Sequence, residues 1–239
     1  MQKSDFCYLC FLNLRKKKMN RWISNQNDPP LPSAEGISDH YIPLTVETID
    51  NHVYFYADVN SDRCLALIQQ IRQIDSHLRT ERASREITDL ISPVPIWLHI
   101  HSYGGHISPA MALADQLRNI TTPIYSIVEG MCASAATLIS TVCHRRFITP
   151  NSFMLIHQLR TFMWGRHDEL ADNMKMLDMA MESIVKIYAE HTKMSKGEIE
   201  KLLGRDSWFN AEECVKLGLV DEFKGARPAN IAAAKRNKK

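Results

Sequence analysis

The stretch that decides the fold of this chain is Gly130-Met131-Cys132-Ala133-Ser134-Ala135-Ala136, where one serine stands among very small residues at the start of an apolar, helix-like run. Small neighbours allow backbone N–H groups to crowd around a reacting oxygen. A serine hydroxyl is a weak nucleophile and needs a base such as histidine. His157 closes a second apolar run, residues 151–156, further along the chain. An aspartate that orients the imidazole would complete a set of catalytic groups.

Length and composition indicate one sizeable hydrophobic core with appendages. The chain has 239 residues, of which 45% are hydrophobic, and a chain of this size can bury such a core. The formal net charge is only +2, so we expect no nucleic-acid partner. Lysine and arginine gather near the two ends, in residues 15–18 and 235–239, and we interpret both clusters as solvated tails.

The six cysteines are scattered along the chain. Cys7 and Cys10 form a Cys-x-x-Cys pair without a second pair or a nearby histidine partner, so we predict no metal site. The other four lie in apolar, helix-like runs and are interpreted as small core residues. These four are Cys64, Cys132, Cys143 and Cys214. This cysteine usage predicts a reducing, cytoplasmic compartment.

The ends of the chain differ in composition from its middle. No run of about 18 apolar residues is present, so no membrane-spanning helix is expected. Residues 6–14 are apolar, but a positive cluster follows them, which is the wrong order for a signal peptide. We expect residues 1–40 to be a mobile N-terminal leader, with Met19 as an alternative start. Residues 41–223 are expected to form the folded domain, and residues 224–239 a basic, flexible tail.

Strand-like and helix-like segments alternate through the folded part. Apolar and β-branched runs predict strands at residues 53–57, 96–100, 123–128, 147–148, 153–156 and 219–220. Helical spacing and capping residues predict the helices. The first begins after Asn60 and runs toward Leu90, and the second begins at Ser108. The next two cover residues 135–143 and 168–191, and the last two begin after Ser195 and Asn210. This alternation is typical of an α/β domain with parallel strands joined by crossover helices. The 168–191 helix is rich in methionine, which favours core or subunit packing over a cofactor site.

Four ordered blocks resemble the proteolytic subunit of the Clp protease, a family of self-compartmentalised serine peptidases, over about residues 53–223. Residues 98–105 resemble the family's strand that ends in Asn-Ser-Pro-Gly-Gly, and residues 130–136 resemble its Gly-x-x-Ala-Ser nucleophile segment. Residues 150–158 resemble its Pro-Asn-Ser…Ile-His-Gln block. Residues 205–221 resemble its block Arg-Asp…Ser-Ala-x-Glu-Ala…Tyr-Gly-Leu-Val-Asp.

The resemblance implies a catalytic triad, with Ser134 as nucleophile, His157 as general base and Asp206 as the residue that orients the histidine. It also implies an oxyanion hole made by the backbone N–H groups of Gly105 and Ala135. Residues 41–223 would then be a serine endopeptidase domain of ClpP/crotonase-like fold, built from repeated β-β-α-type units with a protruding handle helix. The expected reaction is acyl transfer through an acyl-enzyme at Ser134, without a cofactor.

The same resemblance implies a homo-oligomer, a heptameric ring or a double ring stacked through the 168–191 helix. Its chamber would hydrolyse unfolded proteins or peptides, supplied by an AAA+ unfoldase. The sequence departs from the family pattern at His101 and Tyr103, where the family usually has Asn and Pro. It departs again at residues 159–164, where the family usually has Pro and a Gly-rich stretch.

Each candidate residue also has a structural interpretation: Ser134 alone would be a helix-packing serine, His157 a strand-end histidine and Asp206 a loop residue. A catalytically weak or inactive ClpP-like ring scaffold would keep the fold, but such subunits usually lack a triad member. A crotonase-type enzyme acting on acyl-CoA thioesters needs no Ser-His-Asp set. A serine–lysine signal peptidase normally needs a membrane anchor and a catalytic lysine, and neither has an obvious candidate here.

Overall fold

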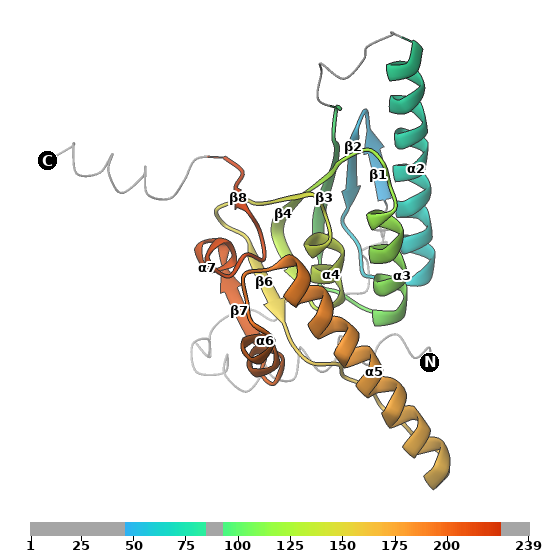
Figure 1. Cartoon of the computed structure of the whole chain (residues 1–239), viewed down its shortest axis with the longest axis vertical. Coiled ribbons are helices and arrows are strands. Elements are labelled where there is room, and N and C mark those ends of the chain that lie inside the picture. The colour runs from blue at the N-terminus through green and yellow to red at the C-terminus, as the bar shows by residue number, and fades with distance from the viewer. Residues whose placement is uncertain (1–45, 85–92, 226–239) are drawn as a thin grey trace, which may run out of the picture. The chain divides into compact units, whose positions relative to one another are not determined.

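The computed structural model describes residues 46–84 and 93–225 (Figure 1). The predicted leader, the tail beyond residue 225 and the Cys7–Cys10 pair lie outside these residues, as does the predicted continuation of the first helix toward Leu90. Strands and helices alternate along the described chain, which confirms the predicted α/β class.

The described strands form one eight-stranded sheet. Its main path runs β1-β2-β3-β4-β5-β8, while β6 pairs with β4 and β7 pairs with β6. The β1–β2 and β6–β7 pairs are antiparallel and the other pairs are parallel, so most neighbours need a crossover connection. The strands are β1 (Val46–Ile49), β2 (His52–Phe55), β3 (Ile96–Ser102), β4 (Ile124–Ala133), β5 (Arg145–Ile148), β6 (Phe153–Ile156), β7 (Ser207–Asn210) and β8 (Glu222–Phe223).

Helices supply these crossovers and cover the sheet. α2 packs on β1, β2 and β3 and lies beside α3, while α4 contacts α3, α5 and β3. The helices of the described residues are α2 (Ser61–Ser84), α3 (Ile107–Arg118), α4 (Ala135–Thr141), α5 (His167–His191), α6 (Lys196–Leu203) and α7 (Ala211–Leu217).

Alternation along β3 separates the apolar core from a polar and aromatic face. Ile96, Leu98 and Ile100 are fully buried, and α2 and α4 contact this strand. Burying one such side chain contributes about 1.5–3 kcal/mol, so these residues decide which face is covered. Successive side chains of a strand point to opposite faces, and Trp97 and His99 therefore lie on the other face of β3.

Strand β4 changes partner along its length. Its first half pairs with β5, from Tyr125 to Val128, and its last residues pair with β6. Gly130 lies between the two halves with a φ of 75°, a conformation that suits glycine. The Gly130 N–H donates to the Ser152 hydroxyl at 2.6 Å, which holds the chain at the change of partner. The change allows β6 to run beside the segment that ends at the candidate serine.

Several predicted helix ends are confirmed. Ser195 caps α6 and Asn210 caps α7, each in a capping box with the glutamate three residues later. Gly218 ends α7 with a left-handed φ of 74°, as expected of a C-terminal glycine.

The predicted start of the second helix at Ser108 is wrong. α3 begins at Ile107 with His106 as its N-cap, and no side chain caps it. The His106 N–H donates to the Val59 carbonyl at 2.8 Å, and this contact fixes the chain just before the helix. Pro109 then falls in the first turn, where a missing N–H costs little.

The predicted final strand at Leu219 and Val220 is also wrong. Both main-chain N–H groups fold back to the Cys214 carbonyl after α7 ends, so they are not available to a neighbouring strand. Pairing with β5 starts later, at Glu222. The short strands β1 and β7 were not predicted from the sequence.

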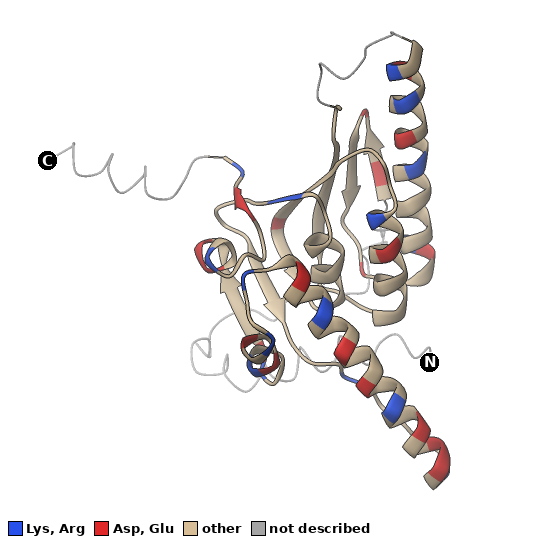
Figure 2. Cartoon of the chain, viewed as in Figure 1, with Lys and Arg blue, Asp and Glu red and all other residues tan. Residues whose placement is uncertain are grey.

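α5 extends away from the sheet at its N-terminal end (Figure 1), which agrees with the predicted handle helix. Met174, Met176 and Met179 are 49%, 55% and 68% exposed along it. Acidic and basic residues are interspersed along α5, and the same mixture is seen on α2 (Figure 2). The methionines of the projecting part therefore do not belong to the core of this chain.

Candidate active site

Ser134 lies where β4 ends and α4 begins, as predicted. Its φ of 56° and ψ of −129° are unusual for a residue with a side chain, and such strain costs on the order of 1–3 kcal/mol and clusters at functional sites. The Ser134 N–H donates to the Leu155 carbonyl at 2.8 Å. A sharp strand-to-helix turn of this kind can present a serine hydroxyl at the end of a sheet.

Strand β6 connects this serine to the predicted base. It pairs in parallel with the end of β4, and Ala133 stands opposite Leu155. Ser134 follows β4 directly and His157 follows β6 directly. Since parallel neighbours run in the same direction, these two residues lie at the same edge of the sheet.

Strand β7 brings the predicted aspartate to this edge. It runs antiparallel to β6, with Ile156 opposite Ser207. Continuing this register by one residue places Asp206, directly before β7, opposite His157, directly after β6. The sheet therefore gathers Ser134, His157 and Asp206 at one edge, although they are distant in sequence.

The three residues are not hydrogen-bonded to one another. His157 Nδ1 lies 2.6 Å from the main-chain oxygen of Gln158, to which it donates. Asp206 accepts from Arg160, whose Nη2 lies 2.5 and 2.6 Å from the two carboxylate oxygens. The Ser134 hydroxyl has no hydrogen-bond partner within the described residues. The structure thus brings the predicted residues to one place with two of them bound to other groups.

Gly104 lets the β3–α3 loop approach the serine closely, and Gly105 lets the same loop approach Val59. Gly104 and Gly105 have φ values of 93° and 149°. A Cβ on Gly104 would lie 2.6 Å from both the Ala133 oxygen and Ser134 Cβ, and one on Gly105 would lie 2.2 Å from the Val59 oxygen. Side-chain atoms cannot come so close, so only glycine fits at either position.

The N–H groups of Gly105 and Ala135 have no hydrogen-bond partner in the part of the chain that the structure describes. The neighbouring His106 N–H, in contrast, is used by Val59. Ala135 is the first residue of α4, where N–H groups lack partners within the helix. An oxyanion hole requires unpaired main-chain donors, and these two belong to the residue directly after Ser134 and to the residue after Gly104, the glycine that approaches Ser134.

A buried hydroxyl pair supports the serine turn from α5. Thr137 Oγ1 donates to the Ser134 carbonyl at 2.5 Å and lies 2.5 Å from the Tyr188 hydroxyl. Burial raises the pKa of Tyr188, so its hydroxyl keeps the proton that it donates to Thr137. The handle helix is therefore connected to the turn that carries the candidate nucleophile.

A cluster of histidines, tyrosines and one glutamate on the outer face of β2, β3 and β4 was missed from the sequence. His52 Nδ1 lies 2.9 Å from His99 Nε2, and His99 Nδ1 lies 2.9 Å from Glu129 Oε1. Tyr56 donates to the other oxygen of Glu129, and Tyr54 stacks on His99. Burial, followed by the charge of His99, lowers the pKa of His52. The sequence does carry a signal for this cluster, because polar side chains stand at every second position of two of its strands.

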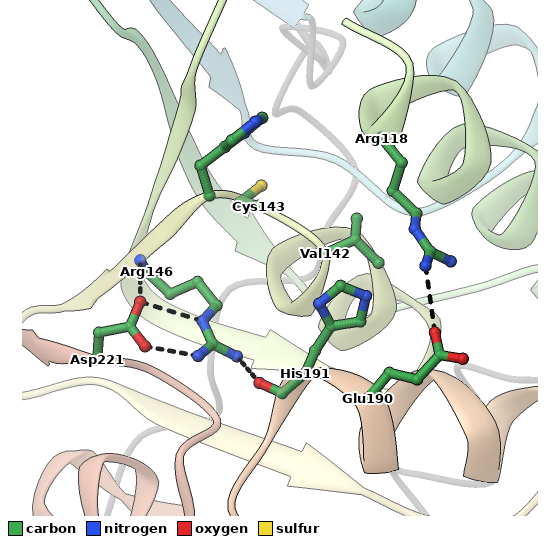
Figure 3. A pocket seen from close by; sticks show the side chains of 8 residues that line it. Arg118, Val142, Cys143, Arg146, Glu190, His191 and Asp221 are labelled. Carbon is green, nitrogen blue, oxygen red and sulfur yellow. Dashed lines mark hydrogen bonds and ion pairs between the residues drawn. The ribbon is translucent and has the colours of Figure 1, made fainter. Parts of the chain in front are cut away.

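A cavity of about 470 Å³ has none of these residues, and none of the candidate triad, in its lining (Figure 3). Arg118 lies 3.1 Å from Glu190, and Arg146 donates to both carboxylate oxygens of Asp221. His191 Nε2 is buried without a partner among the described residues, and burial, then Arg118 and Arg146, lower the pKa of His191. Both arginines are already paired, so the lining leaves neither of them free for a ligand.

Cysteines Cys64, Cys132, Cys143 and Cys214 are buried and unpaired, which confirms them as small core residues. Across residues 46–84 and 93–225, no group of three or more His, Cys, Asp or Glu side chains has the arrangement of a metal site. In the same ranges, no helix has the length and apolar character needed to cross a membrane.

Comparison with known proteins is consistent with the site geometry. A family model described as Clp protease matches residues 50–226. ATP-dependent Clp protease proteolytic subunit 2 of Treponema denticola is 37% identical over 131 residues, which cover 54% of this chain and 66% of that protein. Subunit 1 of Protochlamydia amoebophila is 33% identical over 132 residues, covering 54% and 64%. Subunit 1 of Chlamydia trachomatis is 33% identical over 131 residues, covering 53% and 68%. The chain thus spans about two thirds of the length of these relatives.

A solved structure of a ClpP1 mutant from Listeria monocytogenes is similar to this chain with a TM-score of 0.62. The two are 25% identical in sequence, and the match covers 74% of this chain and 93% of the other. The comparison confirms the predicted ClpP/crotonase-like architecture.

Proposed function

The chain belongs to the Clp protease family, and on that premise we propose that it is a serine endopeptidase acting on unfolded proteins or peptides. The observation that carries the proposal is the convergence of Ser134, His157 and Asp206 at one edge of the sheet. The relatives are named as proteolytic subunits of an ATP-dependent protease, which supports the same activity.

In the proposed reaction, Ser134 Oγ attacks the carbonyl carbon of the substrate while His157 Nε2 takes the hydroxyl proton. The oxygen of the tetrahedral intermediate accepts hydrogen bonds from the N–H groups of Gly105 and Ala135. The C–N bond then breaks, His157 returns its proton to the leaving amine, and an acyl ester remains on Ser134. A water molecule, deprotonated by His157, hydrolyses that ester and regenerates the serine.

The proposed role of Asp206 is to orient the imidazole and stabilise its protonated form. The proposed oxyanion hole rests on the two unpaired donors and on Gly104, which precedes Gly105 and lets the β3–α3 loop approach Ser134. Removing one such donor typically costs about 2.7–4 kcal/mol of transition-state stabilisation. These residues therefore provide the nucleophile, the base, its orienting group and the charge stabilisation that acyl transfer needs.

A catalytically weak or inactive ring subunit is the second candidate. One observation favours it: His157 and Asp206 bind Gln158 and Arg160 instead of each other. The register of β6 and β7 favours the peptidase, because it places the two residues opposite one another. A triad would form if each residue exchanged its present partner for the other.

A serine-reactive phosphonate probe distinguishes the two candidates. We expect the intact protein to be labelled at Ser134, because only an activated hydroxyl attacks the phosphorus. Peptide mapping by mass spectrometry locates the label, and the His157→Ala variant, which lacks the base, should lose most of it. Absence of label at Ser134 in the intact protein would favour the inactive subunit.

For assembly, we propose a homo-oligomeric heptameric ring, with two rings joined through α5. The exposed apolar side chains support this: Phe162 and Trp164 are 91% and 92% exposed just before α5, which itself carries exposed methionines. Contiguous exposed apolar surface marks an interaction site. The enclosed chamber would admit short peptides, and an AAA+ unfoldase would supply unfolded proteins. A reducing cytoplasm suits the four unpaired cysteines.

Sedimentation of a double variant tests this assembly. Replacing Met176 and Met179 with glutamate should halve the particle mass, because buried charge at the contact opposes ring stacking. Lys216→Glu, at an exposed residue of α7, is the control and should keep the wild-type mass. A wild-type chain that is a stable monomer at micromolar concentration would contradict the proposal.

A further inference from the structure

Arg160 lies three residues after His157 and holds the carboxylate of Asp206. Its Nη2 is 2.5 and 2.6 Å from the two oxygens, and the two side chains are 63% and 53% exposed. We infer that Arg160 is a positioning residue that draws Asp206 away from His157 and thereby biases the proposed site toward a disengaged state, in which His157 and Asp206 are not hydrogen-bonded to each other. This inference rests on the proposed peptidase function.

The histidine side of the site agrees with this arrangement. A neutral imidazole that donates through Nδ1 has a single proton there, and His157 gives it to the Gln158 carbonyl at 2.6 Å. The Gln158 N–H in turn donates to the Leu203 carbonyl at 2.8 Å, which anchors that residue beside α6. A Ser-His-Asp set needs the Nδ1–H to donate to the aspartate. His157 and Asp206 must therefore each exchange one partner before the triad can form.

The backbone does not have to move far for this exchange. The register between β6 and β7 already places His157 opposite Asp206, one step beyond the Ile156–Ser207 pair. Rotation of the two side chains is then the main difference between the disengaged and the engaged arrangement. Because Arg160 determines where the Asp206 carboxylate points, it biases the equilibrium between the two.

The solvent exposure of Arg160 and Asp206 limits how strongly Arg160 biases this equilibrium. An ion pair between two largely exposed side chains is weak and is screened by salt. Arg160 is therefore expected to shift the balance and not to lock the site. Removing Arg160 should raise the fraction of molecules in which His157 and Asp206 are paired by roughly two- to fivefold at low ionic strength. Exposed ion pairs typically shift an equilibrium by this factor. Added salt should raise the activity of the wild type and have less effect once Arg160 is gone.

Asp206 is the charged residue that the β6–β7 register places opposite His157, and Arg160 is its ion-pair partner. Arg205 precedes Asp206 without an ion-pair partner among the described residues. A carboxylate beside an imidazole favours its protonated form. If Arg160 releases Asp206 to His157, the titration midpoint of His157 must rise.

The test compares the full chain with Arg160→Gln, Arg160→Lys and Arg145→Gln. Arg145 is an exposed arginine paired with Glu222 away from the site, and it serves as the matched control. NMR titration of the His157 imidazole should give a higher midpoint in Arg160→Gln only. The kcat for short peptides should rise two- to fivefold in the same variant, with its acid limb moved to higher pH. Arg160→Lys keeps the charge and should behave as the wild type.

Identical His157 midpoints in Arg160→Gln and the wild type would overturn the inference. A lower kcat at unchanged KM in Arg160→Gln would also overturn it, because Arg160 would then support the engaged site. Failure of the proposed peptidase function has a different signature: no variant, including the wild type, would show hydrolysis that depends on Ser134. The titration would still decide the role of Arg160 in that case.

Discussion

Replacing Ser134 with alanine should reduce kcat for short fluorogenic peptides by about 10⁶-fold, the loss expected when the nucleophile of a triad is removed. Assembly and thermal stability should remain unchanged. The substitution removes a single oxygen, and that hydroxyl has no hydrogen-bond partner within the described residues. Initial rates and melting curves of the purified particle measure both expectations.

The same experiment includes His157→Ala and the double variant. Groups that act as a unit give non-additive losses, so the double variant should be no slower than either single one. Ser108→Ala on α3 and His77→Ala on α2, both at exposed residues, are matched controls and should keep wild-type rates. Near wild-type hydrolysis by a clean preparation of Ser134→Ala would refute the proposed mechanism.

Replacing Gly105 with alanine should lower the free energy of unfolding by about 2–6 kcal/mol, the sum of overpacking and backbone strain. The new Cβ would lie 2.2 Å from the Val59 oxygen at a φ of 149°. Val59 cannot retreat easily, because it donates to the Gly104 carbonyl and accepts from the His106 N–H, both at 2.8 Å. The shift would also displace the proposed oxyanion donor, so peptide hydrolysis should fall below detection.

Gly197→Ala is the matched control for this glycine. A Cβ at Gly197 meets no atom within 4 Å, and the residue lies in the first turn of α6. Alanine is the better helix former by about 1 kcal/mol, so this variant should be as stable as the wild type or slightly more stable. Urea denaturation and peptide hydrolysis compare the two variants. An unchanged denaturation midpoint for Gly105→Ala would show that the β3–α3 loop can relax.

Local signals in the sequence were sufficient where a few neighbouring residues decide the structure. The helix starts at Ser195 and Asn210 formed as predicted, each in a capping box that needs only a glutamate three residues later. Ser108 offers only an N-cap serine followed by a proline, and α3 starts earlier because Val59, from another part of the chain, binds His106. At that position a tertiary hydrogen bond, and not the local helix-start signal, decided where the helix begins.

Strands β1 and β7 show that local sequence signals were also insufficient where the sheet depends on contacts between distant segments. Each has four residues and little apolar periodicity, and each exists because a neighbouring strand supplies its hydrogen bonds. The histidines of the outer face are similar: His52, His99 and Glu129 come from three strands and meet only when these become neighbours. Neither composition nor spacing along one segment could predict those contacts.

For the candidate site, the sequence by itself determined which residues could carry chemistry and that Ser134 lies at the start of α4 and His157 after β6, whereas the strand β7 that follows Asp206 was not predicted. Their catalytic roles stay predictions. Only the tertiary structure decided that three strand ends share one edge and that Asp206 binds Arg160 in preference to His157. Conformational preference is a property of a few consecutive residues, whereas the partner of an exposed side chain depends on which distant segments the sheet brings within reach.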